Sequence, residues 1–432
     1  MVAKLLLKVT CLTVLGCCPV LFSGAVSAQT PLLYEQEFPF IGYATAEAEG
    51  AIAKLQQQIN SGNVALQFDQ DRGYLDSVLQ ALELDSASQL LVFSKTSLQQ
   101  NLISPSTPRA IYFNDEVYIA WLRGSQVLEI AAMDPNLGPV LYTLNQQASD
   151  QPHFERQMHQ CMRCHDSYGL TGGGTPRFMM SSGYTGQQGQ LVSHESHIMT
   201  TSRTPIKNRW GGWFVSGSHG DQLHLGNVQV ESAADLKPEN LAKFGNLVNL
   251  NSLLDTGPYL TPYSDIVALL LIEHQIEVQN LITRVNYLGR TALENEKSDS
   301  AETQIELEAL SEELVRSLFM VGQPSLRNPV TGLSGFTEMF NDLGPKDSQG
   351  RSLRELDLTN RLFKYPLSYL VYSDAFAALP EQVKGIVFAR ISDVLLGREN
   401  SADFEHLTES DRRAIIEILN ATSTINVEPN SL

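Results

Sequence analysis

One short motif in this sequence, Cys161-Met-Arg-Cys164-His165, has the residue types and the spacing of a cofactor-attachment site. Two thiols separated by two residues match the distance between the two vinyl groups of haem, to which they add as thioethers. The histidine directly after the second cysteine is placed to become the proximal ligand of the iron. The motif therefore predicts one covalent haem c, with Cys161 and Cys164 as attachment residues and His165 as iron ligand.

Three other interpretations of this motif compete with haem attachment. A structural zinc site needs two further ligands, and no second CxxC follows in the chain. A redox-active dithiol is expected at the start of a helix in a βαβ unit, and the glycine-rich sequence after His165 does not fit that context. A simple disulfide between Cys161 and Cys164 leaves the histidine unexplained. Haem attachment accounts for all three residues.

The N-terminal residues carry an export signal, which changes the cysteine count. Two lysines, an apolar run and a small-residue end at Val-Ser-Ala28 predict a signal peptide over residues 1–28, and hence a periplasmic protein. Cleavage there removes Cys11, Cys17 and Cys18, so that both remaining cysteines belong to the motif. A retained membrane anchor and lipid attachment at Cys17 are the alternatives.

The composition and charge limit the partners of the mature chain. The sequence is 43% hydrophobic and 18% charged, as in an ordinary globular protein, and no transmembrane span is predicted after the signal peptide. Its net charge is −18, and loss of the two N-terminal lysines makes it still more negative. Such a surface repels nucleic acid and favours a basic or neutral redox partner.

The residues before the motif predict an α+β domain over 29–150. Apolar periodicity indicates amphipathic helices at 45–60 and 72–83. Strands of a mixed or mostly antiparallel sheet are predicted at 64–68, 89–94, 111–113, 117–121, 127–133 and 139–145, with turns at Asn114-Asp115 and at Asp134-Pro135-Asn136. Asp115 and Glu116 are able to act as an acid and base pair, but a turn exposed to solvent is the simpler interpretation.

The remaining chain is expected to be mostly helical, as a cytochrome c-like haem region over 151–300 and a C-terminal region over 301–432. A helix from Asp150 to Cys164 is predicted to end in the motif, and the glycine-rich stretch 169–189 is predicted to wrap the haem edge. A long helix is expected to follow a cap at Ser264 or Asp265, and residues 304–320 are expected to pack back on it as a second helix. Two more helices are predicted at 381–397 and 409–422, the last capped by Ser410 or Asp411.

The distal ligand of the iron has several candidates. His219 is the first choice because it lies in a glycine-flanked turn, and His224 is the alternative. The other candidates are His274, Met179, Met180 and Met199. Aromatic residues able to stack on a porphyrin are Trp210, Trp213 and Phe214, and cations able to neutralise the haem propionates are Arg203, Lys207 and Arg209.

The chain resembles a family of functionally uncharacterised, exported bacterial proteins with a cytochrome c domain. Two segments carry this resemblance most clearly: the CxxCH motif, and Arg209-Trp-Gly-Gly-Trp213-Phe-Val-Ser-Gly-Ser-His219-Gly followed by His224-Leu-Gly-Asn227. The resemblance extends over most of the mature chain and implies a protein with a single haem c. The segment TSRTPIKN is more weakly similar to dihaem cytochrome c peroxidases, but the single haem motif is a large departure from that family.

These observations favour a periplasmic electron-transfer protein with one haem. A haem enzyme with an open distal side, of the peroxidase or oxidase type, is the alternative, because the chain is much longer than a bare electron carrier requires. A haem subunit of a larger redox complex explains the length equally well. The sixth ligand distinguishes the first two classes, since two strong axial ligands close the iron to small molecules.

Overall fold

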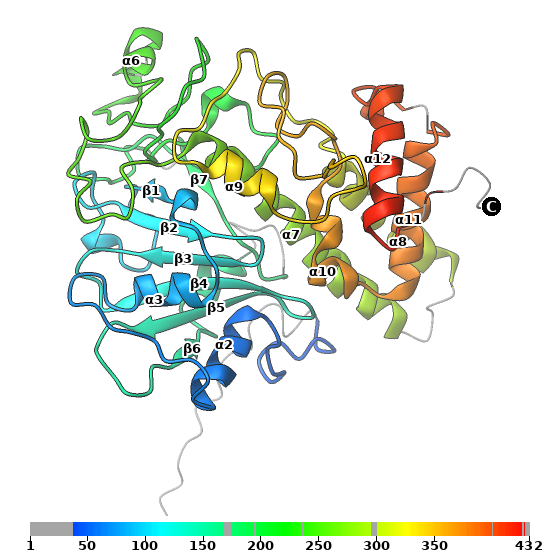
Figure 1. The fold of residues 1–432 in the computed structure, drawn as a ribbon, viewed down its shortest axis with the longest axis horizontal. Helices are drawn as coiled ribbons and strands as arrows, with labels where there is room; N and C mark the ends of the chain where they lie inside the picture. The colour runs from blue at the N-terminus through cyan, green and yellow to red at the C-terminus, as the bar shows by residue number, and fades with distance from the viewer. Residues whose placement is uncertain are drawn as a thin grey trace, which may run out of the picture. The chain divides into compact units, whose positions relative to one another are not determined.

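The two predicted β-hairpins form the middle of one antiparallel sheet in the computed structural model of this chain (Figure 1). The structure describes residues 38–167, 174–193, 196–235, 237–294, 300–399, 401–425 and 427, so that the predicted signal peptide lies outside the described residues. The strands are β1 (Leu90–Val92), β2 (Arg109–Phe113), β3 (Val117–Trp121), β4 (Val127–Asp134), β5 (Gly138–Asn145) and β6 (Phe154–Arg156). The fold is mixed α+β, with this six-stranded sheet in the N-terminal part and a largely helical C-terminal part.

The strands pair in chain order, so the sheet is a simple meander from β1 to β6. Its two central turns are held by side chains of the predicted turn residues. The Asn114 Oδ1 accepts hydrogen bonds from two following backbone N–H groups at 3.0 and 2.9 Å, and the Asp134 Oδ1 does the same at 2.9 Å twice. Asparagine and aspartate favour turns for this reason. Both predicted turns are confirmed.

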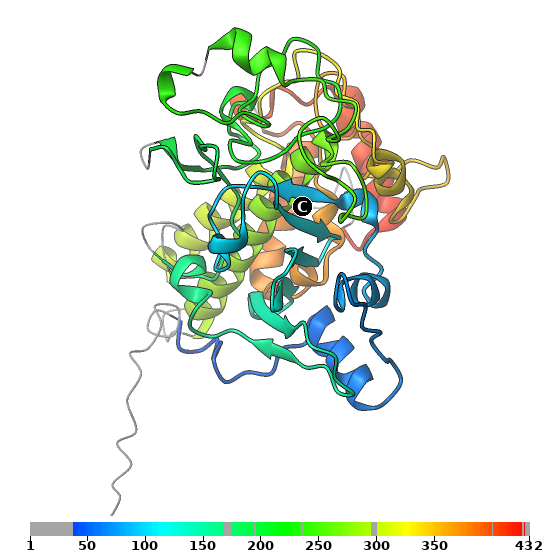
Figure 2. The same ribbon diagram turned by 90° about the vertical axis from the view of Figure 1, so that its left-hand side faces the viewer.

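Helices cover the two faces of the sheet. Figure 2 shows the strands between α2 (Ala51–Asn60) and α3 (Leu75–Ala81) on one side and α7 (Ile266–Glu294) on the other. On the α7 side, the Tyr287 hydroxyl donates to the Leu137 carbonyl at 2.8 Å, and the Gln275 amide donates to the Tyr118 hydroxyl at 2.7 Å. The predicted helices at 45–60 and 72–83 are present as the shorter α2 and α3, but residues 64–68, predicted as a strand, form no regular structure.

The C-terminal helices pack around α7. The helix α8 (Ala301–Leu318) packs against both α7 and α11 (Glu381–Leu395), which confirms the predicted αα-hairpin. The other helices of this part are α9 (Phe336–Asp342), α10 (Asp374–Ala377) and α12 (Glu409–Thr422). The helix α12 packs against α11, with Ile415, Ile418 and Leu419 buried. The predicted helices at 381–397 and 409–422 are confirmed to within two residues.

Within the part of the chain that the structure describes, α7 is the one helix long and apolar enough to cross a membrane. Its length is 29 residues, and 89% of its most apolar window is buried inside the protein. Charged and amide side chains on the helix are also buried, among them Glu273, His274 and Gln275. These features are those of the central helix of a folded core.

The prediction of one helix from Asp150 to Cys164 is wrong. Residues Phe154–Arg156 instead form β6, which pairs with β5 and completes the sheet beyond the domain boundary expected at residue 150. The Gln56 side chain of α2 accepts a hydrogen bond from the Phe154 N–H at 2.8 Å, and Phe154 is buried in the core. The edge of the sheet offers this segment a full set of hydrogen bonds, and this outweighs its local helical pattern.

Between β6 and α7 the regular structure is sparse. Among the described residues it comprises α4 (Met162–His165), α6 (Pro238–Lys243), a ribbon of β7 (Ser181–Ser182) and β8 (Ile198–Met199), and short 3₁₀ turns. This stretch is therefore mostly loop, in contrast to the helical region that the sequence predicts.

The Arg209–Phe214 segment runs along the free edge of β1. The Phe93 N–H donates to the Gly212 carbonyl and the Phe214 N–H to the Leu91 carbonyl, both at 2.8 Å. A Cβ atom at Gly212, which has a φ of +87°, would lie 2.5 Å from the Cβ of Ser94. Close backbone approach therefore explains this glycine of the motif. Trp210, Trp213 and Phe214 are buried in the core, so packing accounts for them without a porphyrin.

Candidate functional site

The CxxCH motif forms one helical turn directly after the sheet ends. The His165 N–H donates to the Cys161 carbonyl at 3.1 Å, closing the turn, and Met162 is buried at 1% exposure in the apolar core next to the sheet. The two cysteines are more accessible, since Cys161 is half-buried and Cys164 is exposed. Met162 therefore anchors the turn and leaves both thiols near the surface.

The His165 ring is held by the backbone of a later segment. Its Nδ1 lies 2.6 Å from the Arg177 carbonyl oxygen, and the Arg177 N–H donates back to the His165 carbonyl at 2.9 Å. A carbonyl only accepts, so Nδ1 carries the proton and Nε2 keeps its lone pair. Histidines that bind metals characteristically donate their other ring N–H in this way, which fixes the ring and its tautomer.

The surroundings of His165 keep its ring neutral. Burial lowers the pKa of His165, and Arg109 lowers it further, whereas the Arg177 carbonyl and Glu129 oppose the shift. A neutral imidazole is the form that donates a lone pair to iron. The donor set at His165 therefore fits a haem iron.

The thiols do not have the character of a redox-active pair. Burial raises the pKa of Cys161 to about 11, and the nearby Glu129 and Cys164 add to this shift. Reactive dithiols instead have a thiol with a lowered pKa. Both cysteines are free, and the described residues contain no group of three or more His, Cys, Asp or Glu side chains that could hold a metal ion. The haem interpretation fits these observations better than the dithiol or the zinc interpretation.

Next to the motif, one half of a sheet face is only partly covered. On this face Phe113, Tyr118 and Met133 are buried on the α7 side. Further along the same strands, Leu141 on this face is buried and Asn145 is exposed, whereas seven other residues that share the face are half-buried. These residues are Arg109, Ile111, Ala120, Val127, Glu129, Ala131 and Thr143. We call these seven residues the shelf.

The shelf lies close to the CxxCH turn. The Gln157 amide, just before the turn, donates to the Thr143 hydroxyl at 2.8 Å, and Glu129 acts electrostatically on both Cys161 and His165. The opposite face of the same strands has no comparable gap, because its alternate residues, such as Ala110, Leu128 and Ile130, are buried. A partly apolar surface beside two accessible thiols is a suitable support for a flat cofactor.

The structure brings His219 and His224 together. Their Nε2 atoms are 3.1 Å apart, both rings are 3% exposed, and His224 packs against Trp210 at 5.3 Å between ring centroids. The Gly226 N–H donates to His224 Nδ1 at 3.0 Å, so that the His224 proton lies on Nε2 and points to His219. His219 Nε2 also accepts from the Asn246 N–H at 3.1 Å.

These hydrogen bonds affect whether His219 or His224 is free to be the distal ligand of the iron. Burial lowers the pKa of His224 to about 3 and also lowers that of His219, so both rings stay neutral. None of the described contacts joins either ring to Cys161, Cys164 or His165. Each histidine would have to give up a buried hydrogen bond to bind iron through Nε2. The assignment of His219 or His224 as distal ligand stays a prediction.

The remaining distal candidates are also placed in packed surroundings. His274 is fully buried, and its Nε2 lies 2.8 Å from the Ser368 hydroxyl while its Nδ1 lies 3.1 Å from the Gln323 amide nitrogen. Met180 is buried in the core, whereas Met179 and Met199 are half-buried. His274 is thus a satisfied core histidine.

The predicted propionate partners are mostly engaged elsewhere. Arg209 is 3% exposed and forms a buried ion pair with Glu273 at 2.6 Å, and it also donates to the Ser202 carbonyl at 2.6 Å. Arg203 pairs with Glu277 at 2.9 Å, and Lys207 is exposed. Arg209 therefore already has a carboxylate partner in the core, and its role as a partner of the haem propionates stays a prediction.

Sequence reasoning missed Arg177, which lies next to His165 only in the folded chain. Its separation of 12 residues from His165 carries no periodic signal, and residues 168–173 between them lie outside the described residues. The glycine-rich loop predicted to wrap the haem edge falls partly on these same residues. The one sequence signal was the short Thr-Pro-Arg177 segment after the glycines, because a proline restricts the backbone where the chain comes back to the motif.

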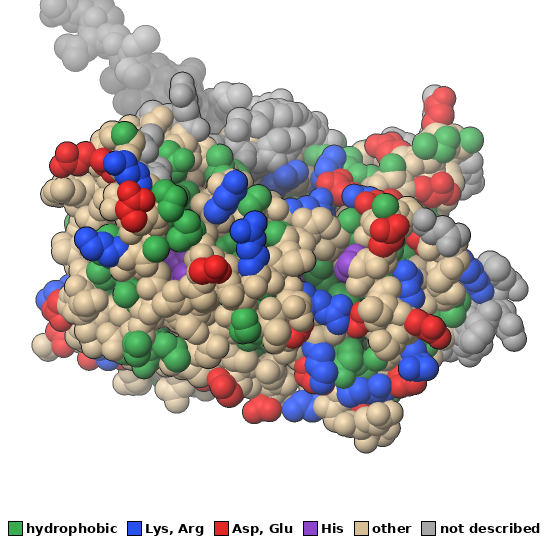
Figure 3. Space-filling view, turned by 90° about the horizontal axis from the view of Figure 1, so that it is seen from above, with side chains coloured by type: hydrophobic (Ala, Val, Ile, Leu, Met, Phe, Trp, Pro, Cys, Tyr) green, Lys and Arg blue, Asp and Glu red, His purple; other side chains and the backbone are tan. Residues whose placement is uncertain are grey.

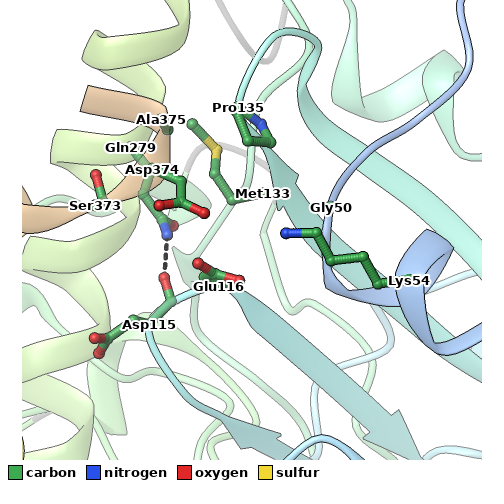
Figure 4. A pocket seen from close by; sticks show the side chains of 10 residues that line it. All are labelled: Gly50, Lys54, Asp115, Glu116, Met133, Pro135, Gln279, Ser373, Asp374 and Ala375. Carbon is green, nitrogen blue, oxygen red and sulfur yellow. Dashed lines mark hydrogen bonds between the residues drawn. The ribbon is translucent and has the colours of Figure 1, made fainter. Parts of the chain in front are cut away.

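A separate pocket lies where the sheet meets the C-terminal helices (Figure 4). Its walls include Lys54, Glu116, Gln279 and Asp374, and the Gln279 amide donates to the Asp115 carbonyl at 2.7 Å. Burial raises the pKa of Glu116, and Asp374 adds to the shift while Lys54 opposes it. The Asp115 carboxylate pairs with Arg354, an arrangement that accounts for this side chain without an acid–base role.

Searches of protein families, of curated proteins and of solved structures found no match to this chain.

Proposed function

We propose that this chain is an exported monohaem c-type cytochrome that transfers electrons. Cys161 and Cys164 would hold the haem covalently, and His165 Nε2 would be the proximal ligand of the iron. The observation that carries this proposal is the 2.6 Å bond from His165 Nδ1 to the Arg177 carbonyl, which leaves Nε2 unprotonated on a fixed ring. The shelf beside the motif and the resemblance in sequence support the same cofactor.

The haem would supply a one-electron iron couple, whose potential depends on the axial ligands, on burial and on nearby charges. The chain's own residues would determine these conditions. Met162 anchors the attachment turn, the Arg177 carbonyl orients the His165 ring, and the shelf covers one side of the site. The exposed Cys164 indicates that an edge of the cofactor would be accessible to a partner.

We propose a basic or neutral redox protein as the partner, in the periplasm. The net charge of −18 favours attraction of a basic partner and repels nucleic acid. Acidic and basic side chains are interspersed on the face shown in Figure 3, so the negative excess is not concentrated there. Export through residues 1–28 and the alternative of a lipid anchor at Cys17 are part of the same proposal.

A haem enzyme with an open distal side is the second candidate. The observation that favours it is that His219, His224 and His274 are all hydrogen-bonded inside the protein. If none of them reaches the iron, one axial position is left for a small ligand such as a peroxide. This candidate shares the proximal site and differs only on the distal side.

The first experiment is production of the full chain together with the cytochrome c maturation machinery. We expect haem that resists acid–acetone extraction in the wild type and in Cys17→Ala, and none in the Cys161→Ala/Cys164→Ala variant. Absence of covalent haem from the wild type would refute the proposal. Spectra with carbon monoxide then separate the two candidates, because an electron carrier with two strong ligands does not bind it, whereas an open iron does.

A further inference from the structure

The side chain of Arg177 has no partner in the described part of the chain. The residue is half-buried, its Nε is shielded from solvent without a hydrogen bond, and no ion pair among the described residues involves its guanidinium. Glu313, whose charge acts on Arg177, is itself paired with Arg284 at 3.1 Å. Leaving a partly buried cation without a partner costs free energy.

A second incomplete donor lies on the shelf. Arg109 pairs with Glu129 through Nη1 at 2.7 Å, but its Nε is buried and has no partner. Glu129 is also held by the Gln99 amide at 3.1 Å, so this carboxylate is already occupied. The charge of Arg109 acts on His165, and the backbone carbonyl of Arg177 contacts the His165 ring.

We infer that the guanidinium of Arg177 binds a propionate of the haem, and that the spare Nε–H of Arg109 donates to the carboxylates of the same cofactor. This inference rests on the proposed function. Haem carries two carboxylates and therefore needs cationic donors near the histidine that binds its iron. Arg177 carries its unpaired charge on the residue whose backbone holds that histidine, and Arg109, whose charge acts on His165, has an unused donor. Arg203 and Arg209 lack both features because Glu277 and Glu273 neutralise them.

The first test is the midpoint potential of the haem-loaded protein at fixed pH and salt. Arg177→Gln removes a positive charge that disfavours the ferric state, so we expect a lower potential. A tenfold change in the oxidised-to-reduced ratio at the wild-type midpoint corresponds to about 59 mV for one electron. Arg177→Lys keeps the charge and should stay near the wild type. Arg109→Gln should give a smaller decrease.

Arg72→Gln is the matched control. Arg72 lies beside α3, on the opposite face of the sheet, and pairs with Asp76 near the surface. This variant changes the net charge equally, but salt screens exposed charges over about 10 Å. If Arg177→Gln shifts the potential no more than Arg72→Gln does, the inference is wrong while the proposed function stands. Absence of covalent haem from the wild type overturns both.

A second test needs no covalent attachment. In the full-length Cys161→Ala/Cys164→Ala variant, we expect haemin to bind about tenfold more tightly than haemin dimethyl ester, whose carboxylates are blocked. Adding Arg177→Gln should reduce this preference, because only the Arg109 donor then remains, and should leave binding of the ester unchanged. Equal affinity for haemin and its ester in the presence of Arg177 would overturn the inference. If Arg177→Gln prevents covalent attachment of haem, this comparison of haemin with its ester still tests the inference.

Discussion

At the scale of single residues, His165 and His274 have different hydrogen-bond surroundings. The His165 ring bonds to a backbone carbonyl and keeps an unprotonated Nε2, as a metal ligand requires. Both ring nitrogens of His274 have partners within the core, and it is fully buried. The two residues differ because His165 keeps a nitrogen without a described partner, whereas His274 does not. The sequence gives no sign of this difference.

Because His274 is buried, we expect the free energy of unfolding to decrease in acid. Burial lowers its pKa from an ordinary 6.5 to about 3. Between these values the unfolded chain binds a proton at His274 and the folded chain does not, so stability falls as the pH falls. The loss from pH 6.5 to pH 5 is about 2 kcal/mol. His274→Gln keeps a donor and an acceptor but cannot titrate, so its stability should fall less over this range.

Urea denaturation at pH 7 and pH 5 measures this effect. His153→Gln, at an exposed position, is the control and should follow the wild type. A pH dependence that is identical in His274→Gln and the wild type would show that His274 does not remain neutral.

At the scale of elements, the start of α12 shows how a helix end is selected. The sequence suggests Ser410 or Asp411 as the cap, but the N-cap is Thr408. The Thr408 hydroxyl accepts from the Asp411 N–H at 3.1 Å, and the Asp411 carboxylate accepts from the Thr408 N–H at 3.0 Å. Asp411 also pairs with Arg361 at 2.6 Å, which ties this helix end to a preceding loop.

Removal of this cap should destabilise the protein measurably. We expect Thr408→Ala to lower the free energy of unfolding by about 1 kcal/mol, because a capping hydroxyl satisfies a helix N–H that is otherwise left without a partner. Ser410→Ala is the matched control in the same turn, and its hydroxyl contacts only the Thr408 side chain. Equal losses in the two variants, measured by chemical denaturation, would contradict the assignment of the cap.

At the scale of the whole molecule, the sheet and α7 meet at the turn between β4 and β5. Gly138 has a φ of +68°, and a Cβ atom there would lie 2.7 Å from Thr283 Oγ1 in the middle of α7. Tyr287 on the same helix donates to the Leu137 carbonyl at 2.8 Å. The packing of the sheet on the C-terminal helices therefore depends on one close approach of backbone to helix.

Two glycine substitutions test this contact. Gly124 has a φ of +76° but no atom within 4 Å of its potential Cβ. Gly124→Ala should therefore cost only the left-handed backbone strain, about 1–2 kcal/mol. Gly138→Ala should cost about 1–3 kcal/mol more because of overpacking against Thr283. The double variant Gly138→Ala/Thr283→Ala should recover part of that excess in thermal denaturation. Equal effects of the two single substitutions would show that the contact is not tight.

The sequence by itself determined the local features of this protein. Alternating apolar residues and Asn or Asp turns predicted the hairpins, and apolar periodicity predicted α7, α8, α11 and α12, because these signals act over neighbouring residues. The CxxCH motif identified the candidate attachment residues in the same way, since three adjacent positions carry its chemistry.

Only the tertiary structure decided which distant residues meet at the site. It turned Phe154–Arg156 into a strand through hydrogen bonds with β5, and it engaged Arg209 with Glu273 across the core. It also placed the Arg177 carbonyl on His165 and left part of one sheet face half-covered beside the cysteines. These contacts join residues far apart in the chain, and their formation depends on which buried polar groups find partners once the whole core has packed.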